Sequence, residues 1–390
     1  MRIERASGER PRLAFIINSL AGGGAERVFC RLIEGFEDRL RDCESEIVLL
    51  DDEPHAYTPP DFVPMRTLGA ARRMGSSVAR LTAEMRRFKP HAAVSFLNRA
   101  NCANVLAARL CGYRTVISER VATAHHFGDG PGGRLKRAVT RELYRRADAV
   151  LAVSEGVRLG LIEDCGLPAE RIAVIPNPVD VARIRTAGAA PPETPLPELF
   201  IVSVNRLTAN KNVRLQLEAL NRSGLTHHLV ILGDGPERGA LQERAEALGL
   251  CNRVHFVGFS ANPFAIVARA QMFVSTSNAE GFPNALAEAM ALGVPCISTS
   301  CRAGPAEILA GDPRLEASAM HPASYGVLTP VGDADACAAA LRFMADPKRR
   351  AHYGERAAER AASYAPEGVI ESYWRAISRV AAPPQRERGR

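Results

Sequence analysis

The sequence predicts an α/β protein made of two doubly wound, Rossmann-like domains that face each other across a cleft. Short apolar runs rich in β-branched residues alternate with helical stretches, which is typical of parallel sheets covered on both faces. The chain of 390 residues is too long for one ordinary core. A proline-rich stretch, AGAAPPETPLPE, interrupts the alternation once, between halves of similar size.

The strands are expected where apolar runs end in turn residues. They cover residues 13–17, 46–50, 92–96, 115–118, 149–153 and 172–175 in the first half, and 199–204, 228–232, 254–257, 272–275 and 295–298 in the second. The helices between them include residues 25–36, 72–89, 135–146, 211–220, 237–248 and 284–292.

These elements give the domain organisation. We expect a first domain over residues 1–185, a linker over 186–198 and a second domain over 199–365. A helix over 366–382 is expected to return to the first domain. The tail, 383–390, is expected to be disordered.

Composition narrows the class of protein. No apolar run approaches the roughly 20 residues that span a bilayer, and we expect no secretory signal before the first strand. The nine cysteines form no C-x-x-C pair, which argues against a zinc site and for a reducing cytoplasm. Of the net charge of +7, residues 62–146 carry a local balance of +13, so an anionic partner is expected for the first half unless these charges only decorate solvated faces.

The most informative segment is STSNAEGFPNALAEAMALG, residues 275–293, which follows a strand and opens a helix. Glu280 precedes the turn and Glu288 lies one to two turns into the helix, so two carboxylates can contact separate parts of one polyol ligand. Free N–H groups at a helix start can donate to a hydroxyl or phosphate. The turn consists of Gly281, Phe282, Pro283 and Asn284.

A second group of candidate residues follows the first strand of the second domain, in the run SVNRLTANKN. Arg206 and Lys211 offer one bidentate guanidinium and one point charge, which suit a diphosphate that gains negative charge as it leaves. Glycines follow three other strands and let the backbone approach a ligand: Gly23 and Gly24 in AGGGAE, Gly233 in GDGP, and Gly258. The GDGP run lacks the spacing of a dinucleotide fingerprint.

Two further features are open to two interpretations. His125 or His126, in SERVATAHH, could contact the reacting group or be a surface histidine; His126 is preferred. The basic helices predicted over 72–89 and 135–146 could bind anionic lipid or be ordinary surface helices, with Arg73, Arg80 and Arg87 sharing one face of the first. Asp333-Ala-Asp335 resembles a metal-binding DxD motif, but we interpret Asp333 as a helix N-cap and expect no metal.

The runs GGGAERV, ISER, IPNPVD, NRLTANKN, GDGP and EGFPNALAEAMALGVP together resemble retaining glycosyltransferases of family 4, which have the GT-B fold; the resemblance spans residues 12 to about 374. It implies that Arg206 and Lys211 hold a donor diphosphate, that Glu288 contacts the ribose and that Glu280 lies beside the transferred sugar. The glycine loop 22–24 is implied to close over diphosphate and acceptor. Retention by front-face attack, with the leaving phosphate helping to deprotonate the acceptor, needs no cofactor and no divalent ion.

GGGAERV with ISER and CRAGPAEIL is similar to a bacterial subgroup that adds N-acetylgalactosamine or related hexoses to undecaprenyl-diphosphate-linked sugars. The implied function is transfer of a hexose, N-acetylated in the preferred version, from a UDP-sugar to a lipid-linked saccharide in surface glycan, capsule or lipopolysaccharide assembly. The implied place is the inner face of the cytoplasmic membrane, as a peripheral protein.

Three alternatives stay open. A transferase of the same class could use UDP-glucose, UDP-galactose or GDP-mannose on lipopolysaccharide core. A UDP-sugar 2-epimerase would act without an acceptor, but the first half lacks obvious catalytic carboxylates. A nucleic-acid binder is disfavoured by an aromatic content of only 6%.

Overall fold

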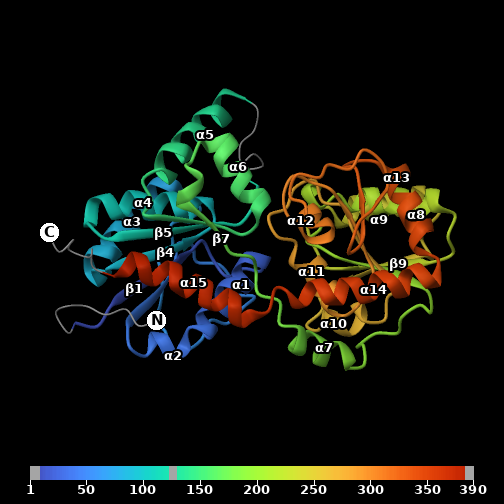
Figure 1. Cartoon of the computed structure of the whole chain (residues 1–390), viewed down its shortest axis with the longest axis horizontal. Coiled ribbons are helices and arrows are strands. Elements are labelled where there is room, and N and C mark those ends of the chain that lie inside the picture. The colour runs from blue at the N-terminus through green and yellow to red at the C-terminus, as the bar shows by residue number, and fades with distance from the viewer. Residues whose placement is uncertain (1–8, 123–129, 383–390) are drawn as a thin grey trace, which may run out of the picture. The chain divides into compact units, whose positions relative to one another are not determined.

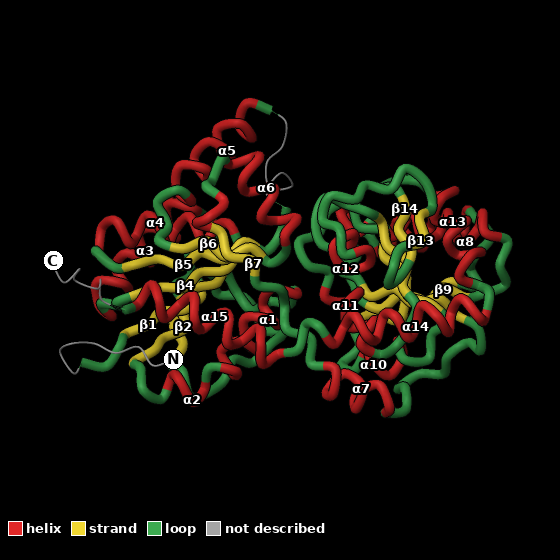
Figure 2. Tube along the Cα trace, viewed as in Figure 1, coloured by secondary structure: helices red, strands yellow, loops and turns green. Residues whose placement is uncertain are grey.

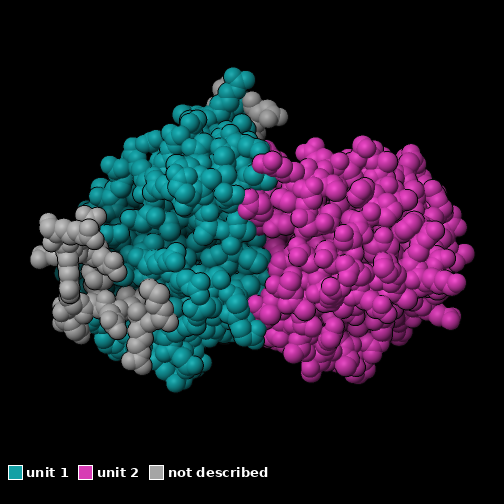
Figure 3. Space-filling model, in the orientation of Figure 1, with its two compact units in different colours: residues 1–153, 157–178, 367–390 teal, residues 154–156, 179–366 magenta. Residues whose placement is uncertain are grey.

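The protein is described by a computed structural model over residues 9–122 and 130–382, which form two compact units (Figure 3). Unit 1 takes the described residues within Met1–Val153, Val157–Pro178 and Glu367–Arg390. Unit 2 takes Ser154–Gly156 and Val179–Pro366. The predicted tail, 383–390, lies outside the described residues.

Unit 1 contains a seven-stranded sheet in the order β3-β2-β1-β4-β5-β6-β7, with every pairing parallel (Figures 1 and 2). The central strand β4 reads AAVSF and is buried throughout, as expected for a strand covered on both faces. The strands are β1 Arg12–Ile17, β2 Glu44–Leu49, β3 Met65–Thr67, β4 Ala92–Phe96, β5 Arg114–Glu119, β6 Ala149–Ala152 and β7 Ile172–Val174.

Helices cover both faces of this sheet. Alternate residues of β1 point to opposite faces: Phe15 joins a core with Phe29 of α1 and Trp374 of α15, whereas Ile16 joins a core with Leu81 of α3 and the alanines of α4. The helices are α1 Gly24–Gly35, α2 Glu37–Leu40, α3 Met74–Phe88, α4 Asn98–Cys111, α5 Pro131–Tyr144, α6 Glu155–Cys165 and α15 Pro366–Ala381.

Unit 2 contains a second seven-stranded sheet in the order β10-β9-β8-β11-β12-β14-β13, parallel except for the short edge strand β13. The strands are β8 Phe200–Val204, β9 His228–Leu232, β10 Val254–Gly258, β11 Met272–Ser275, β12 Cys296–Thr299, β13 His321–Pro322 and β14 Val327–Thr329. The helices are α7 Val181–Ala189, α8 Val213–Ser223, α9 Arg238–Ala247, α10 Pro263–Val267, α11 Asn284–Ala291, α12 Pro305–Ala310, α13 Ala334–Met344 and α14 Pro347–Ala362.

All eleven predicted strands and all seven predicted helices, including the one predicted over 366–382, are present, with shifts of a few residues at their ends. The prediction of two doubly wound, Rossmann-like domains is therefore confirmed at the level of each unit. The strands that the sequence analysis missed, β3, β13 and β14, have two or three residues each, too few to show a period.

The boundary between the units differs from the predicted linker. The units divide at Pro178/Val179, inside the PNPVD run, and the stretch 186–198 belongs to unit 2. Asp180 caps the start of α7 by accepting a hydrogen bond from the N–H of Arg183 at 3.0 Å. The helix then runs to Ala189, shortly before the first proline of the run. The proline-rich stretch therefore begins within the last turn of α7, a capped helix of unit 2, and does not separate the units.

Candidate active site

The loop that follows β8 begins with one buried residue and one exposed residue. Asn205 is buried, and its side-chain amide donates to the hydroxyl of Ser203. Arg206, the next residue, is exposed, and its guanidinium has no hydrogen-bond or ion-pair partner among the described residues. The loop therefore presents one uncommitted cation beyond the carboxyl end of the sheet, where ligands of open α/β sheets bind.

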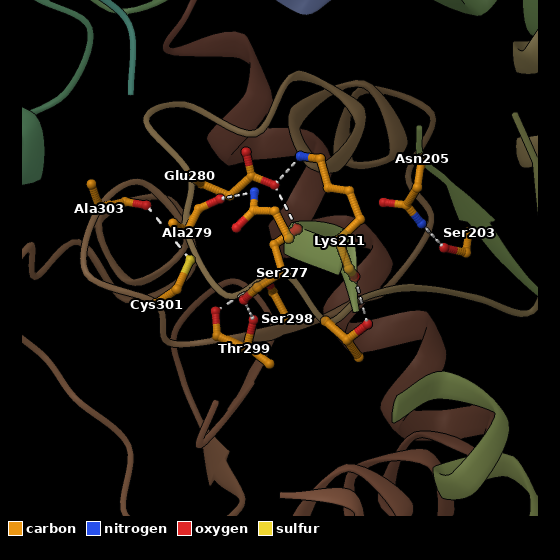
Figure 4. A network of polar contacts seen from close by, with 12 residues as sticks. Ser203, Asn205, Lys211, Ser277, Ala279, Glu280, Ser298, Thr299, Cys301 and Ala303 are labelled. Carbon is orange, nitrogen blue, oxygen red and sulfur yellow. Dashed lines mark hydrogen bonds and ion pairs between the residues drawn. The ribbon is translucent and has the colours of Figure 1, made fainter. Parts of the chain in front are cut away.

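The centre of the candidate site is Glu280, which lies in the loop after β11 (Figure 4). Lys211 Nζ lies 2.5 Å from Glu280 Oε1, and Ser277 Oγ donates to the same oxygen at 2.7 Å. The described residues give Glu280 Oε2 no partner. The side chains of Lys211 and Glu280 are 26% and 12% exposed, so the pair is screened from bulk water but open on one side.

Hydrogen bonds fasten the loop after β8 to the loop after β11. Asn210 Nδ2 donates to the carbonyl of Ala279 at 2.9 Å, and the N–H of Asn278 donates to the carbonyl of Asn210 at 2.8 Å. The buried hydroxyl of Thr276 donates to the carbonyl of Asn212 at 2.9 Å. The two loops thus form one rigid body that fixes the distance between Lys211 and Glu280.

The end of β12 and the loop after it lie against the segment that carries Glu280. Thr299 Oγ1 donates to the carbonyl of Ser277 at 2.7 Å, which holds the residue that orients Glu280. Cys301 is buried close by, and burial, with a smaller contribution from Glu280, raises the pKa of its thiol to about 12. The thiol stays protonated, so it adds no second negative charge to the site.

The glycines of GDGP are required by a close approach of the backbone. A Cβ on Gly233 would lie 1.9 Å from the carbonyl oxygen of Asn205, and one on Gly235 would lie 2.3 Å from that of Leu207. The N–H of Gly233 donates to the carbonyl of Gly258 at 2.7 Å, which joins the ends of β9 and β10. The GDGP run is therefore a tight turn that brings three strand ends together.

Helix α11 carries the second predicted carboxylate. Pro283 is its N-cap residue and Asn284 its first residue, and the N–H groups of Gly281 and Phe282 find no acceptor within the described part of the chain. Glu288 is 8% exposed and makes interactions of its own. The helix start therefore offers donors next to Glu280, and Glu288 lies largely buried further along the same helix.

Of the site residues predicted in unit 1, the structure describes the glycines but not the two histidines. Gly22 has φ +108, a left-handed conformation that favours glycine, and Gly23 is the extended N-cap of α1, with Gly24 its first residue. His125 and His126 lie outside the described residues. The glycine loop therefore has the geometry of a close-approach turn.

Sequence reasoning missed a buried polar network at the end of β5. Glu119 accepts a hydrogen bond from the hydroxyl of Tyr144 at 2.5 Å and one from the N–H of Arg120 at 3.0 Å. Arg120 Nη1 donates to the hydroxyl of Tyr373 on α15 at 2.6 Å. Burial, and then the charge of Glu119, raise the pKa of Tyr144 well above its usual range, so Tyr144 stays a donor. The ISER run was the only signal of this network in the sequence.

Asp333 accepts a hydrogen bond from the N–H of Ala336 at 2.9 Å and caps α13, and Asp335 pairs with Arg222 at 2.9 Å. The interpretation of Asp333 as a helix cap is therefore confirmed.

In the described part of the chain, no helix is long and apolar enough to cross a membrane.

The arrangement in unit 2 can bind two chemical groups side by side. Arg206 and Lys211 supply positive charge for an anion, and the open carboxylate oxygen of Glu280, with the N–H groups at the start of α11, can orient hydroxyls. An anion joined to a polyol therefore fits these strand ends.

Solved structures with the same fold define the class. HepE of Anabaena in complex with UDP aligns over 94% of this chain and 100% of its own, with TM-score 0.73 and 20% identity. The lipopolysaccharide outer core galactosyltransferase WaaB aligns over 94% of this chain and 99% of its own, with TM-score 0.70 and 22% identity. The likeness shows the fold: the two Rossmann-like units are those of the GT-B glycosyltransferases.

The family follows from sequence matches. Residues 22–183 match Glycosyltransferase Family 4, and residues 189–360 match Glycosyl transferases group 1. Because the two matches together span most of the chain, the protein belongs to these glycosyltransferases and is a transferase enzyme. The family resemblance of the motifs is thereby confirmed.

Two characterised relatives are similar in sequence. The chain is 26% identical over 367 residues, 90% of this chain and 95% of the relative, to the N-acetylgalactosamine-N,N'-diacetylbacillosaminyl-diphospho-undecaprenol 4-alpha-N-acetylgalactosaminyltransferase of Campylobacter jejuni. It is 34% identical over 168 residues, 42% of this chain, to the lipopolysaccharide 1,6-galactosyltransferase of Salmonella typhimurium. The match covers 46% of that second relative, about half its length.

Proposed function

We propose that the protein transfers a hexose, preferably an N-acetylhexosamine, from a UDP-sugar to a lipid-linked saccharide, with retention of anomeric configuration and without a metal ion. The observation that carries the proposal is the cluster of Lys211, Ser277 and Glu280, together with the uncommitted Arg206 in the loop that also carries Lys211. The Campylobacter relative, which acts on an undecaprenol-linked sugar, supports the acceptor class, and the UDP complex of HepE supports the nucleotide.

In this proposal the two cations bind the donor diphosphate. Arg206 and Lys211 stabilise the negative charge that grows on the leaving phosphate, which is the task a metal ion performs in other transferases. Glu280 accepts hydrogen bonds from hydroxyls of the transferred sugar through Oε2, while Lys211 and Ser277 hold Oε1. The leaving phosphate takes the acceptor proton, so the chain needs no separate base. Glu288 contacts the ribose, and His126 or His125 and the glycine loop 22–24 belong to the acceptor side.

In this proposal the protein acts on a lipid-linked acceptor at the inner face of the cytoplasmic membrane. The basic balance of residues 62–146 supports contact with anionic lipid, and the helices predicted over 72–89 and 135–146 are the two candidate surfaces.

The similarity to the Salmonella enzyme, 34% over 168 residues, favours one alternative: transfer of galactose from UDP-galactose to lipopolysaccharide core. A donor panel tells the two apart. The protein is incubated in EDTA, without acceptor, with UDP-N-acetylgalactosamine, UDP-N-acetylglucosamine, UDP-galactose, UDP-glucose and GDP-mannose, and thermal stabilisation and slow hydrolysis are measured for each.

The proposal expects stabilisation and hydrolysis with a UDP-N-acetylhexosamine in EDTA, and neither with Lys211→Ala. A preference for UDP-galactose would select the lipopolysaccharide alternative. Conversion of the UDP-sugar to its 2-epimer without acceptor would select the epimerase. Silence with every donor until a divalent ion is added would contradict metal-independent transfer.

A further inference from the structure

The two basic helices of unit 1, α3 and α5, differ in how far their side chains are buried and paired. On α3, Leu81 and Met85 are fully buried in the core, Arg80 donates to the carbonyl of Leu68, and Arg87 pairs with both Glu46 and Glu84. Leu81, Met85 and two of the three aligned arginines therefore serve unit 1 itself. Helix α3 has the contacts of an ordinary surface helix.

Helix α5 keeps apolar side chains in solvent. Leu135 is 67% exposed and Val139 is 50% exposed, and they lie one turn apart on the same side of the helix. The opposite side attaches the helix to unit 1: Tyr144 is fully buried against Glu119, and the hydroxyl of Thr140 lies 4.0 Å from the sulfur of Cys102. In Figure 1, α5 extends from the top of this unit.

Basic side chains flank the exposed apolar pair. Residues 131–146 contain six Lys or Arg and one acidic residue, Glu142, which pairs with Arg146. Arg134, Lys136 and Arg141 are exposed and make no ion pair with any described residue. An exposed apolar pair among unpaired cations, on a helix whose other exposed residues are mostly polar, fits the boundary between lipid headgroups and acyl chains.

We propose that α5 is the membrane-contacting surface of this protein, and that it binds an anionic bilayer. Leu135 and Val139 insert between headgroups, and Arg134, Lys136 and Arg141 bind lipid phosphates. A second copy of the chain is a poorer occupant, because a two-fold contact would bring these cations against one another. The inference deepens the proposed function by naming the surface that meets the acceptor's membrane, and it is tested by binding alone, without donor or acceptor.

The experiment measures binding of the full chain to vesicles of phosphatidylcholine with and without phosphatidylglycerol. Leu135→Ser/Val139→Ser tests the apolar pair, and Leu199→Ser/Val331→Ser makes the same chemical change at exposed positions of unit 2. Arg134→Glu/Arg141→Glu tests the cations, and Arg73→Glu/Arg86→Glu makes the same change in net charge on α3. Circular dichroism and thermal unfolding confirm that each variant is folded.

We expect each α5 variant to bind anionic vesicles at least about tenfold more weakly, and each control to stay within about twofold, because only groups at the surface lose burial and charge contacts. Equal losses for the two charge-reversed pairs would mean that net charge alone drives binding, and would overturn the proposal. So would wild-type binding by both α5 variants, or an oligomer that the α5 variants dissociate.

Insertion itself has a spectroscopic test. Trp374 is the one tryptophan of the chain and is 1% exposed, so it gives a constant background. Leu135→Trp should show a blue-shifted emission with anionic vesicles and quenching by brominated lipid. Unchanged emission from a variant that does bind the vesicles would overturn insertion at α5. These outcomes do not depend on which donor the enzyme uses.

Discussion

The carboxyl ends of the two sheets carry similar residues in opposite states. Glu119, at the end of β5, is fully buried and accepts hydrogen bonds on both oxygens, whereas Glu280, after β11, keeps one oxygen without a partner among the described residues. Arg120 is 6% exposed and donates to Tyr373 and Asn177, whereas Arg206 is exposed and uncommitted.

The difference distinguishes charged residues that stabilise the fold from charged residues that can bind a ligand. A buried charge must be fully hydrogen-bonded, so its loss costs folding free energy. A charge with unused hydrogen-bonding capacity at a strand end contributes little to folding and can bind a ligand. We therefore assign the network around Glu119 to stability and the cluster around Glu280 to donor binding.

The largest expected effect is on turnover, at Lys211 and Glu280. Lys211→Ala and Glu280→Ala should each lower turnover by about 10²–10³-fold, the usual loss when one charge-stabilising group is removed from an active site. Unfolding temperatures should change little, because both side chains are partly exposed. Arg214→Ala, which removes an exposed arginine three residues from Lys211, is the control and should keep its activity. Full activity in either site variant would remove these residues from the mechanism.

The second prediction concerns stability, at Glu119. Glu119→Ala should lower the free energy of unfolding of unit 1 by about 3 kcal/mol, because it leaves the buried hydroxyl of Tyr144 and the N–H of Arg120 without their charged acceptor. The same change at Glu280 should cost less than about 1 kcal/mol. Chemical denaturation of both variants measures the contrast, and equal losses would erase the distinction between the two strand ends.

Ser277 should show a smaller effect. Ser277→Ala removes one of the two groups that hold Glu280 Oε1, and should lower turnover by about tenfold, the value of one hydrogen bond to a charged group. Ser277→Thr keeps a hydroxyl and should recover part of the loss. Because Glu280 stays in place, we expect a lower kcat more than a higher KM. Equal activity of the alanine variant and the wild type would show that Lys211 alone orients the carboxylate.

The smallest prediction is a pH effect at Asp51 of unit 1. Burial acts to raise the pKa of Asp51, but hydrogen bonds from Arg99 and from the N–H of Arg72 outweigh it, so the pKa lies below its ordinary 3.8. A lowered pKa in the folded state means that the contribution is complete above pH 3.8 and is lost as pH falls below it. Asp51→Asn should therefore be less stable than the wild type near pH 6, and the difference should shrink toward pH 3. A constant difference would show that Asp51 acts without titrating.

The sheets and most of the site residues could be predicted from the sequence, because strands and motifs are encoded by residues that are close together along the chain. The β-branched runs predicted both sheets, and Arg206, Lys211 and Glu280 each lie in the segment that follows such a run. What could not be read is how separate loops meet. Ser277 was visible, but its bond to Glu280 depends on Thr299 at the end of β12 and on Asn210 in the segment after β8.

The same reason explains what stayed open and what was wrong. Helical spacing alone does not show that Leu135 is exposed and Leu81 is buried. The proline-rich run looked like a domain linker because its composition was considered without the aspartate cap of α7 before it.

The central claim is that donor chemistry occurs at the strand ends of unit 2, and hydrogen exchange tests it most directly. UDP is added to the full chain in EDTA, and the exchange of backbone N–H groups is followed by mass spectrometry. The account predicts slower exchange in peptides that cover residues 203–212 and 276–288, and little change around Glu119. Slower exchange confined to unit 1, with residues 203–212 and 276–288 unchanged, would contradict it.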